Sequence, residues 1–388
     1  MAEKEFDLLC IGNAIVDIFI TLDTSSKNSG EALDGGQFFA RLGLDKSVQH
    51  IEMEKLLMIL PRLPDNAPAV IGSGGGAANA AKISAFLGTK VCFIGAVGAG
   101  SANSEEYAHN TLPFPDKYGR IFQEELAAAG AELKLYLKPS PTGICLYCQS
   151  GGETRIAASP SAALELSESE ISFDDIGKAK VVLIDGFMLG RQGLVRHIFE
   201  LVKRSGAAAA IDLSSPAIAE TYAAHIMNYA NHHPLILFMN EEEALSFYSA
   251  IKNKESEIRN DKLETLNEKL EKAGNVFQAL TNGKKNLIIV VKLGSRGAVC
   301  FSEGLASHAE TQAVIPKEST GAGDAFCAAF LAAWIQGKTA AECAAFGNRA
   351  AKIILGITGT RISGEQFRTR LWAGLDTRGI NSIRNRRY

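Results

Sequence analysis

Short apolar runs rich in valine and isoleucine alternate along this chain with longer stretches that have the period of a helix. Continuous apolar runs are typical of strands that are buried on both faces, so the alternation predicts a parallel sheet with helices on each side. The predicted strands are 7–12, 90–97, 181–185, 208–213, 235–239, 287–293 and 297–301. The predicted helices are 77–87, 118–129, 191–204, 241–250, 255–273, 323–336 and 339–355. The sequence therefore predicts a three-layer α/β fold.

Two regions, 13–53 and 135–160, depart from this rhythm. They contain segments such as "IVDIFITL" and "GICLYCQS", in which apolar and polar residues alternate as in strands with one exposed face. These regions predict a small β-sheet laid over one edge of the main sheet. The large domain would then consist of 1–12, 54–134 and 161–388.

Composition excludes several classes of protein. A net charge of −3 over 388 residues gives no reason to expect a nucleic acid or a membrane surface as a partner. No apolar run reaches the ~18 residues that span a bilayer, and no signal-peptide pattern is seen at the N-terminus. The 7 cysteines lie mostly inside apolar runs, which favours reduced thiols and a cytoplasmic location. Cys145 and Cys148 would face opposite ways on a strand, which argues against a metal or redox site.

The segment "KESTGAGDAF", residues 317–326, contains the strongest functional signal. The residues after Asp324 are apolar or small at every helical position, which predicts a buried helix that begins at Gly321-Ala322-Gly323. A helix N-terminus offers unpaired N–H groups, and glycines let an anion touch the backbone. Because a carboxylate there would repel a merely bound phosphate, Asp324 makes sense as a base that deprotonates an attacking hydroxyl. The structural alternative is a tight turn before a core helix.

Two other phosphate-binding patterns fit less well. The triplet Gly337-Lys338-Thr339 resembles the end of a P-loop, but it follows a helix instead of opening one. The segment "GSGGGA", residues 72–77, fits the glycine pattern of a dinucleotide-binding fold. In such a fold an acidic residue at the end of the next strand binds the ribose hydroxyls of the cofactor. The strand that follows here, "VCFIGAVGAG", has no such acid. A dehydrogenase is therefore disfavoured.

Several motifs together resemble those of the PfkB, or ribokinase-like, family of carbohydrate and nucleoside kinases. The resemblance extends over essentially the whole chain, in the family's order and spacing. It is carried by "GNAIVD" at 12–17, "GGGAANAA" at 74–81, "TGICLY" at 142–147, "GGETR" at 151–155, "IDLSSP" at 211–216, "NEEE" at 240–243, "KLGSRGA" at 292–298, "GAGDAF" at 321–326 and "GNRAA" at 347–351. The resemblance implies a ribokinase-like sheet with a small β lid. It also implies transfer of the γ-phosphoryl group of ATP to a hydroxymethyl group.

The resemblance implies roles for residues around the acceptor. Asp324 would be the base, and the backbone of Gly321, Ala322 and Gly323 would stabilise the charge that develops on the phosphate. Hydroxyl groups of the substrate would bind residues of the N-terminal motif and of the glycine-rich helix, namely Asn13, Asp17, Gly74, Gly75 and Asn79. Asn79 could instead be a helix cap.

Other residues would bind the nucleotide and its metal. The resemblance implies that Asn240 and Glu243 organise Mg²⁺, largely through water, which suits a cation that prefers oxygen ligands and keeps its waters. The nucleotide would contact Asn240, Lys292, Gly294, Gly297, Gly321, Gly323 and Asn348. Lys292 could equally form a structural ion pair, and Asn348 could hydrogen-bond within its helix. A monovalent cation such as K⁺ is a further cofactor that the resemblance leaves open.

The sequence departs from the family pattern in two places. Glu318-Ser319 replaces the usual Asp-Thr of the catalytic loop. The negative charge and the hydroxyl group are both retained, but the charge stands on a longer side chain. The link after the "GAVG" turn is expanded by residues 99–115, which predicts an exposed excursion near the lid.

The acceptor is not fixed by the sequence. The motifs "GNAIVD", "DGFML", "DLSSPAI" and "LFMNEEEA" lean toward the adenosine-kinase-like branch, with a fructose- or ribose-type sugar kinase as the alternative. A nucleoside needs an aromatic slot, for which Phe19, Phe38, Tyr147 and Phe187 are candidates. A non-catalytic sugar- or nucleotide-binding protein of the same fold is the alternative from another class. The protein is expected to be a monomer or a lid-mediated homodimer.

Overall fold

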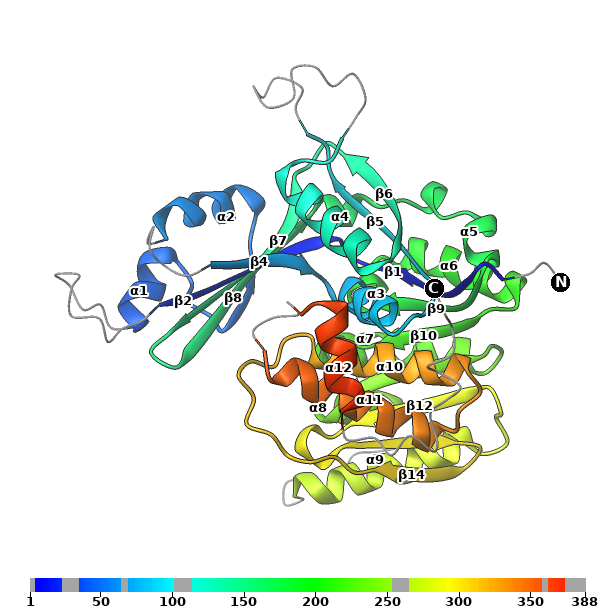
Figure 1. Ribbon diagram of the computed structural model, residues 1–388. Helices are drawn as coiled ribbons and strands as arrows, with labels where there is room; N and C mark the ends of the chain where they lie inside the picture. The colour runs from blue at the N-terminus through cyan, green and yellow to red at the C-terminus, as the bar shows by residue number, and fades with distance from the viewer. Residues whose placement is uncertain are drawn as a thin grey trace.

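The computed structural model describes residues 4–22, 35–63, 69–100, 114–252, 265–357 and 362–373 (Figure 1). The described chain forms two sheets, a large one surrounded by helices and a small one that projects to one side. This is the α/β architecture with a second, smaller sheet that the alternation of apolar runs predicts.

The large sheet has nine strands in the order β14-β13-β12-β11-β10-β9-β1-β5-β6. The bounds are β1 Phe6–Ile11, β5 Val91–Gly98, β6 Glu132–Lys138, β9 Ala179–Asp185, β10 Ala208–Asp212, β11 Leu235–Asn240, β12 Leu287–Lys292, β13 Ala298–Ser302 and β14 Leu305–Ala309. All neighbouring strands from β12 to β6 pair in parallel, whereas β13 and β14 add an antiparallel edge.

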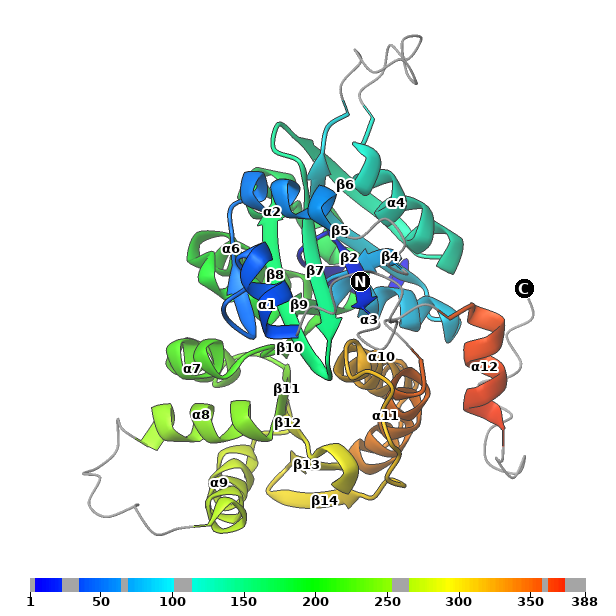
Figure 2. The same cartoon turned by 90° about the vertical axis from the view of Figure 1, so that its left-hand side faces the viewer.

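Helices cover both faces of this sheet (Figure 2). One face packs against α3 Gly76–Phe86, α4 Lys117–Ala129, α10 Ala322–Ile335, α11 Ala340–Leu355 and α12 Gly364–Trp372. The other packs against α5 Phe173–Gly177, α6 Gln192–Ser205, α7 Pro216–Ala230, α8 Glu241–Lys252 and α9 Leu266–Thr281. In β1, Leu8 and Cys10 join the first core, and Leu9 and Ile11 join the second. The strand is thus buried on both faces, which explains its continuous apolar sequence.

The small sheet has the order β3-β8-β7-β2-β4. Its strands are β2 Ile15–Leu22, β3 Val48–His50, β4 Ala69–Gly74, β7 Thr142–Ser150 and β8 Glu153–Ser161, and the short helices α1 Gly35–Leu42 and α2 Met53–Ile59 belong to the same part of the chain. Figure 1 shows this unit projecting from the large sheet at the side where α3 begins. Four of its five strands, β2, β3, β7 and β8, come from the two regions that the sequence predicts as a small sheet.

The sheet boundaries differ from the predicted ones at two strands. Residues 69–74, predicted in the large domain, pair with β2 of the small sheet, and residues 135–138, predicted in the lid, pair with β5 of the large sheet. Both are edge strands of their sheets. The sequence of β6, ELKLYLK, alternates like a strand with one exposed face and so resembles the small sheet, whereas that of β4, AVIGSG, shows neither clean alternation nor a long apolar run.

Helix prediction missed α7, although Ser215 caps it and Pro216 stands in its first turn, which is a common N-terminal signal. The helix predicted at 255–273 begins at Leu266 and continues to Thr281, and part of the prediction lies outside the described residues. The excursion predicted at 99–115 also falls largely outside them. No helix in the described part of the chain is long and apolar enough to cross a membrane.

Candidate active site

Polar residues end four neighbouring parallel strands at the same edge of the large sheet. Asp185 ends β9, Asp212 ends β10, Asn240 ends β11 and Lys292 ends β12. Strand register places Asp212 beside Asp185 and Asn240 beside Lys292. The carboxyl ends of parallel strands are the usual ligand-binding edge of an open α/β sheet.

The N-terminus of α10 faces this edge. Gly321 caps the helix with φ of 80°, a left-handed conformation that glycine adopts without strain. The N–H of Ala322 donates weakly to the carbonyl of Ser319, 3.3 Å away, and the following N–H groups lie in the turn where a helix has no internal acceptors. Asp324 stands in this first turn. The structure thus forms the glycine-lined helix entry that the sequence predicts.

Asn79 and Asp324 meet across the site. Nδ2 of Asn79 donates to Oδ2 of Asp324 at 2.9 Å, so the Asn79 side chain is no helix cap; the cap of α3 is Gly75, with φ of 95°. A Cβ atom on Gly76 would lie 3.3 Å from Oδ1 of Asp324. The glycine-rich loop therefore allows the carboxylate to sit against the head of α3.

Burial raises the pKa of Asp324 to about 7, and the negative charge of Asp212 adds to this effect. The hydrogen bond from Asn79 and the charge of Lys292 act in the opposite direction. A carboxyl group with a pKa near the working pH suits a general base, because it both accepts and releases a proton readily.

Asp17, on β2, is buried in the wall of the small sheet. Burial raises its pKa to about 8, partly offset by the charge of Lys82 and increased by that of Asp324. Its Oδ1 atom is buried and has no hydrogen-bond partner among the described residues, and the same holds for Oδ1 of Asn13. A Cβ atom on Gly74 would lie 2.2 Å from the Asp17 carboxyl carbon, and one on Gly75 would lie 2.3 Å from the carbonyl oxygen of Asn13. Any side chain at Gly74 or Gly75 would therefore clash with Asp17 or with the backbone of Asn13, the candidates for substrate binding.

An aromatic pair lies on the same face of the small sheet. Phe19 and Tyr147 stack with ring centroids 4.4 Å apart and an interplanar angle of 12°. Phe19 follows Asp17 by two positions on β2, so both side chains point to one face. Burial, followed by the charge of Asp17, raises the pKa of the Tyr147 hydroxyl. Phe187, in contrast, is exposed, and the side chain of Phe38 lies outside what the structure describes.

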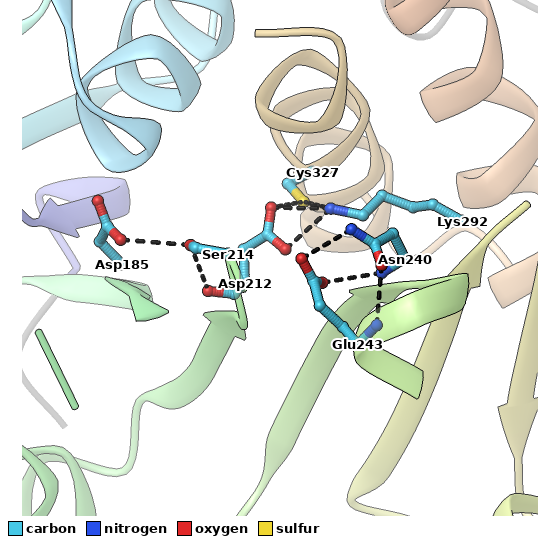
Figure 3. A network of polar contacts seen from close by, with 7 residues as sticks. All are labelled: Asp185, Asp212, Ser214, Asn240, Glu243, Lys292 and Cys327. Carbon is cyan, nitrogen blue, oxygen red and sulfur yellow. Dashed lines mark hydrogen bonds and ion pairs between the residues drawn. The ribbon is translucent and has the colours of Figure 1, made fainter. Parts of the chain in front are cut away.

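Lys292 forms an ion pair with Asp212 (Figure 3). Its Nζ atom lies 2.8 and 2.9 Å from the two carboxylate oxygens. Burial opposes the ammonium charge, but Asp212 and the surrounding acids raise the pKa of Lys292, so the ion pair stays charged. The same Nζ atom would lie 3.2 Å from a Cβ on Gly323. Lys292 is therefore both a member of an ion pair and a neighbour of the α10 entry.

Asn240 and Glu243 bind each other closely, as Figure 3 also shows. The backbone N–H and Nδ2 of Asn240 donate to the two carboxylate oxygens of Glu243 at 2.9 and 2.8 Å, and the Glu243 N–H donates to Oδ1 of Asn240 at 2.9 Å. Burial raises the pKa of Glu243 to about 7, and the charge of Lys292 opposes this shift. Because each side-chain oxygen already accepts a hydrogen bond, the pair suits outer-sphere contact with a hydrated cation. No group of acids, histidines or cysteines within the described ranges could enclose a metal ion directly.

The remaining nucleotide candidates lie beyond β12. Gly294 and Gly297 flank a short turn, with φ of 57° and 86°, and a Cβ on Gly297 would lie 2.1 Å from the carbonyl oxygen of Ala309. Asn348, on α11, donates from Nδ2 to that same Ala309 carbonyl at 2.8 Å. Its hydrogen bond thus reaches β14 and does not stay within its own helix. In the modified loop, Glu318 accepts the N–H of Thr320 at 2.5 Å.

Two acids at the site were not predicted as site residues. Asp185 is buried behind the glycine loop, where burial raises its pKa and the Phe187 N–H counteracts the shift. Asp212 holds Lys292. Both end apolar strands that sequence analysis identified, and an acid in that position is the signal that could have found them.

Comparison with known proteins identifies the family to which the chain belongs. Residues 115–366 match the model of the pfkB family carbohydrate kinases. The chain is 24% identical over 373 residues to adenosine kinase 1 of Arabidopsis thaliana, covering 92% of this chain and 96% of the relative. It is 26% identical over 322 residues to a ribokinase of the same plant, covering 80% and 74%.

Solved structures agree with the fold. An adenosine kinase from Sinorhizobium meliloti superposes with a TM-score of 0.69 at 23% identity, over 92% of this chain and 96% of that one. A probable sugar kinase from Rhizobium etli gives 0.70 at 23%, over 92% and 95%. The class is therefore that of the sugar and nucleoside kinases, which transfer phosphoryl groups. The chain belongs to the pfkB family of carbohydrate kinases.

Proposed function

We propose that this protein is an ATP-dependent kinase that phosphorylates the hydroxymethyl group of a nucleoside, with adenosine-like compounds as the first candidates. The observation that carries the proposal is the position of Asp324, a buried carboxyl in the first turn of α10 beside a glycine-lined helix entry. The relatives at low identity include both adenosine kinases and a ribokinase, so a free sugar is the second candidate.

The chemistry follows from the residues at the helix entry. Asp324 takes the proton of the acceptor hydroxyl as that oxygen attacks the γ-phosphoryl group of ATP. The N–H groups of the 321–323 turn point toward developing negative charge, which the partial positive end of the helix also favours. Asn79 holds the Asp324 carboxylate in place.

Substrate hydroxyls have partners opposite the base. The buried Oδ1 atoms of Asp17 and Asn13 have no hydrogen-bond partner in the described structure. An acceptor left unpaired in this way costs stability, which a sugar hydroxyl would recover on binding. Gly74 and Gly75 keep the approach to these atoms free of side chains.

The nucleotide would bind at the carboxyl ends of β11 and β12 and at the turn that follows β12. Lys292 supplies a positive charge next to Gly323, and Gly294, Gly297 and Asn348 line the region that follows it. Asn240 and Glu243 fit a hydrated Mg²⁺, which, when bound, would neutralise charge on the phosphates. Of these residues, Lys292, Asn240 and Glu243 suit the phosphate side of ATP.

The aromatic pair favours a nucleoside over a free sugar. Phe19 and Tyr147 lie on the same face of the small sheet as Asp17, and a flat base can stack on such a surface while its ribose reaches the carboxylate. A free sugar has no flat base to stack on these rings.

The test is phosphoryl transfer from ATP to a panel of adenosine, other nucleosides, ribose and fructose. We expect turnover with a nucleoside, lowered about 10²–10⁴-fold by Asp324→Asn, because removal of a general base costs that much. Asp174→Asn, at an exposed acid of α5, is the matched control and should keep full activity. Substrate binding, followed by thermal shift, should survive in Asp324→Asn. If wild type and Asp324→Asn are equally inactive on every acceptor yet bind ligand, the protein is a binding protein of this fold.

A further inference from the structure

A groove lies between α6 and α7. These helices belong to the layer that covers the second face of the large sheet (Figure 2). Its volume is about 430 Å³, within the range of small-molecule sites. None of its lining residues belongs to the candidate active site. We call it the α6–α7 groove.

The floor of the groove is aromatic. Phe199 of α6 and Tyr229 of α7 stack with ring centroids 4.0 Å apart and an interplanar angle of 21°. His233 lies 4.8 Å from the Tyr229 ring. The Tyr229 hydroxyl is buried and has no hydrogen-bond partner in the part of the chain that the structure describes. Aromatic surfaces of this kind can stack against a flat ring. The Tyr229 hydroxyl would be available for a hydrogen bond to a ligand.

The rim of the groove is cationic. Exposed Arg196 and Lys203 project from the same face of α6, where residues seven apart lie one above the other. Neither has an ion-pair partner among the described residues. Three histidines, His225, His232 and His233, also line the groove, and Glu200 is the one acid among its lining residues. The balance of charge favours an anion.

The charge on His233 is sensitive to such an anion. Burial, followed by the positive charge of Lys203 and of His232, lowers its pKa, and Glu200 acts weakly in the opposite direction. A phosphate at this rim would offset the repulsion among these cations. Binding and protonation of His233 would then favour each other.

We propose that the α6–α7 groove is a second ligand site for a small aromatic molecule that carries a phosphate group, with a nucleoside monophosphate as the simplest example. The ring would lie against the Phe199–Tyr229 floor, where aromatic surfaces stack. The phosphate would lie between Arg196 and Lys203, since charged donors form the stronger hydrogen bonds to phosphate oxygens. This site does not depend on the proposed phosphoryl transfer.

The test is a titration of the full-length protein with AMP, followed by the imidazole proton resonances in NMR spectra. The chain has only 7 histidines, so the signals of His225, His232 and His233 are assignable through single His→Gln variants. We expect saturable shifts of these signals. Adenosine, which lacks the phosphate, and inorganic phosphate, which lacks the ring, should each bind at least about tenfold more weakly, because loss of a charged or stacked contact has an effect of that size.

Adjacent residues of α6 provide a matched pair of variants. Lys203→Ala should weaken AMP binding about tenfold, whereas Arg204→Ala should not, because Arg204 lies over the ring of Phe173, outside the groove. Both variants should retain wild-type phosphoryl transfer. Equal AMP affinity in Lys203→Ala and Arg204→Ala, or no saturable shift in folded wild-type protein, would overturn the proposal. Histidine shifts that follow protein concentration without AMP would assign the groove to self-association instead.

Discussion

The Nδ2 atom of Asn79 lies 2.9 Å from Oδ2 of Asp324, and this hydrogen bond joins the head of α3 to the first turn of α10 across 245 positions of sequence. A donor at this distance stabilises the charged form of the carboxyl group, whereas burial and the charge of Asp212 destabilise it. The protonation state of the proposed base thus depends on burial, on the charge of Asp212 and on a hydrogen-bond donor from another helix.

Asn79→Ala should raise the pKa of Asp324 above its value of about 7. Because a protonated carboxyl cannot take a proton from the substrate, kcat rises with pH through this pKa. Loss of one charge-assisted hydrogen bond should move that rise upward by about one pH unit. The measurement is kcat between pH 5.5 and 9. Ser84→Ala, which removes another buried polar group from α3, is the control and should leave the profile in place. Identical profiles for Asn79→Ala and wild type would contradict the assignment.

The Lys292–Asp212 ion pair predicts strong coupling in a double-mutant cycle. Lys292→Met leaves the half-buried Asp212 carboxylate without its cation, so the free energy of unfolding should fall by about 3 kcal/mol. Adding Asp212→Leu removes the uncompensated charge and should restore most of that loss. Urea denaturation at pH 7 gives these values.

The exposed pair Lys178–Glu5 is the matched comparison for this cycle. Lys178→Met should leave the free energy of unfolding nearly unchanged, because water screens an exposed pair. If the two lysine variants cost the same, the Lys292 pair is not energetically distinct.

Asp17→Asn should change the pH dependence of stability. The folded-state pKa of Asp17, about 8, lies above its ordinary value of 3.8. The folded chain therefore holds this proton more tightly than the unfolded chain does. Stability from Asp17 is complete below pH 3.8 and is lost as pH rises through about 8.

Asn cannot ionise, so the stability advantage of Asp17→Asn over wild type should grow by about 1.4 kcal/mol for each pH unit between pH 5 and about 8 and then level off. Thermal unfolding across that range measures it, with Asp45→Asn at an exposed acid as the control. Affinity for the acceptor should fall in the same variant. An advantage that is constant with pH would show that Asp17 ionises normally.

Glu243→Gln should raise the Mg²⁺ concentration needed for half-maximal activity. The Gln side chain keeps the shape but loses the charge that a hydrated cation requires, and an outer-sphere contact of this kind is worth about 10–100-fold in metal affinity. Glu242→Gln changes the exposed neighbour on α8 and should behave as wild type. Magnesium titrations of phosphoryl transfer at pH 8 compare the three proteins. An unchanged magnesium requirement in Glu243→Gln would remove Glu243 from the metal site.

The sequence alone determined the features that depend on neighbours along the chain. Apolar runs predicted seven of the nine strands of the large sheet, all but β6 and β14, because a strand buried on both faces has no polar positions. The glycines before Asp324 predicted a helix entry open to an anion, since the positive φ of Gly321 and the first turn of a helix are local properties. The proposed base could therefore be named before any fold was known.

The tertiary structure alone decided which distant residues meet. Asp212 and Lys292 lie 80 positions apart and become partners only because β10 and β12 flank β11 in the sheet. Similarly, Asn79 reaches Asp324 only because α3 and α10 pack on one face. Residue periodicity records which face of an element is buried but not which element covers it. The order of strands, the sheet to which the edge strands β4 and β6 belong, and the pKa values of the buried acids follow from that packing.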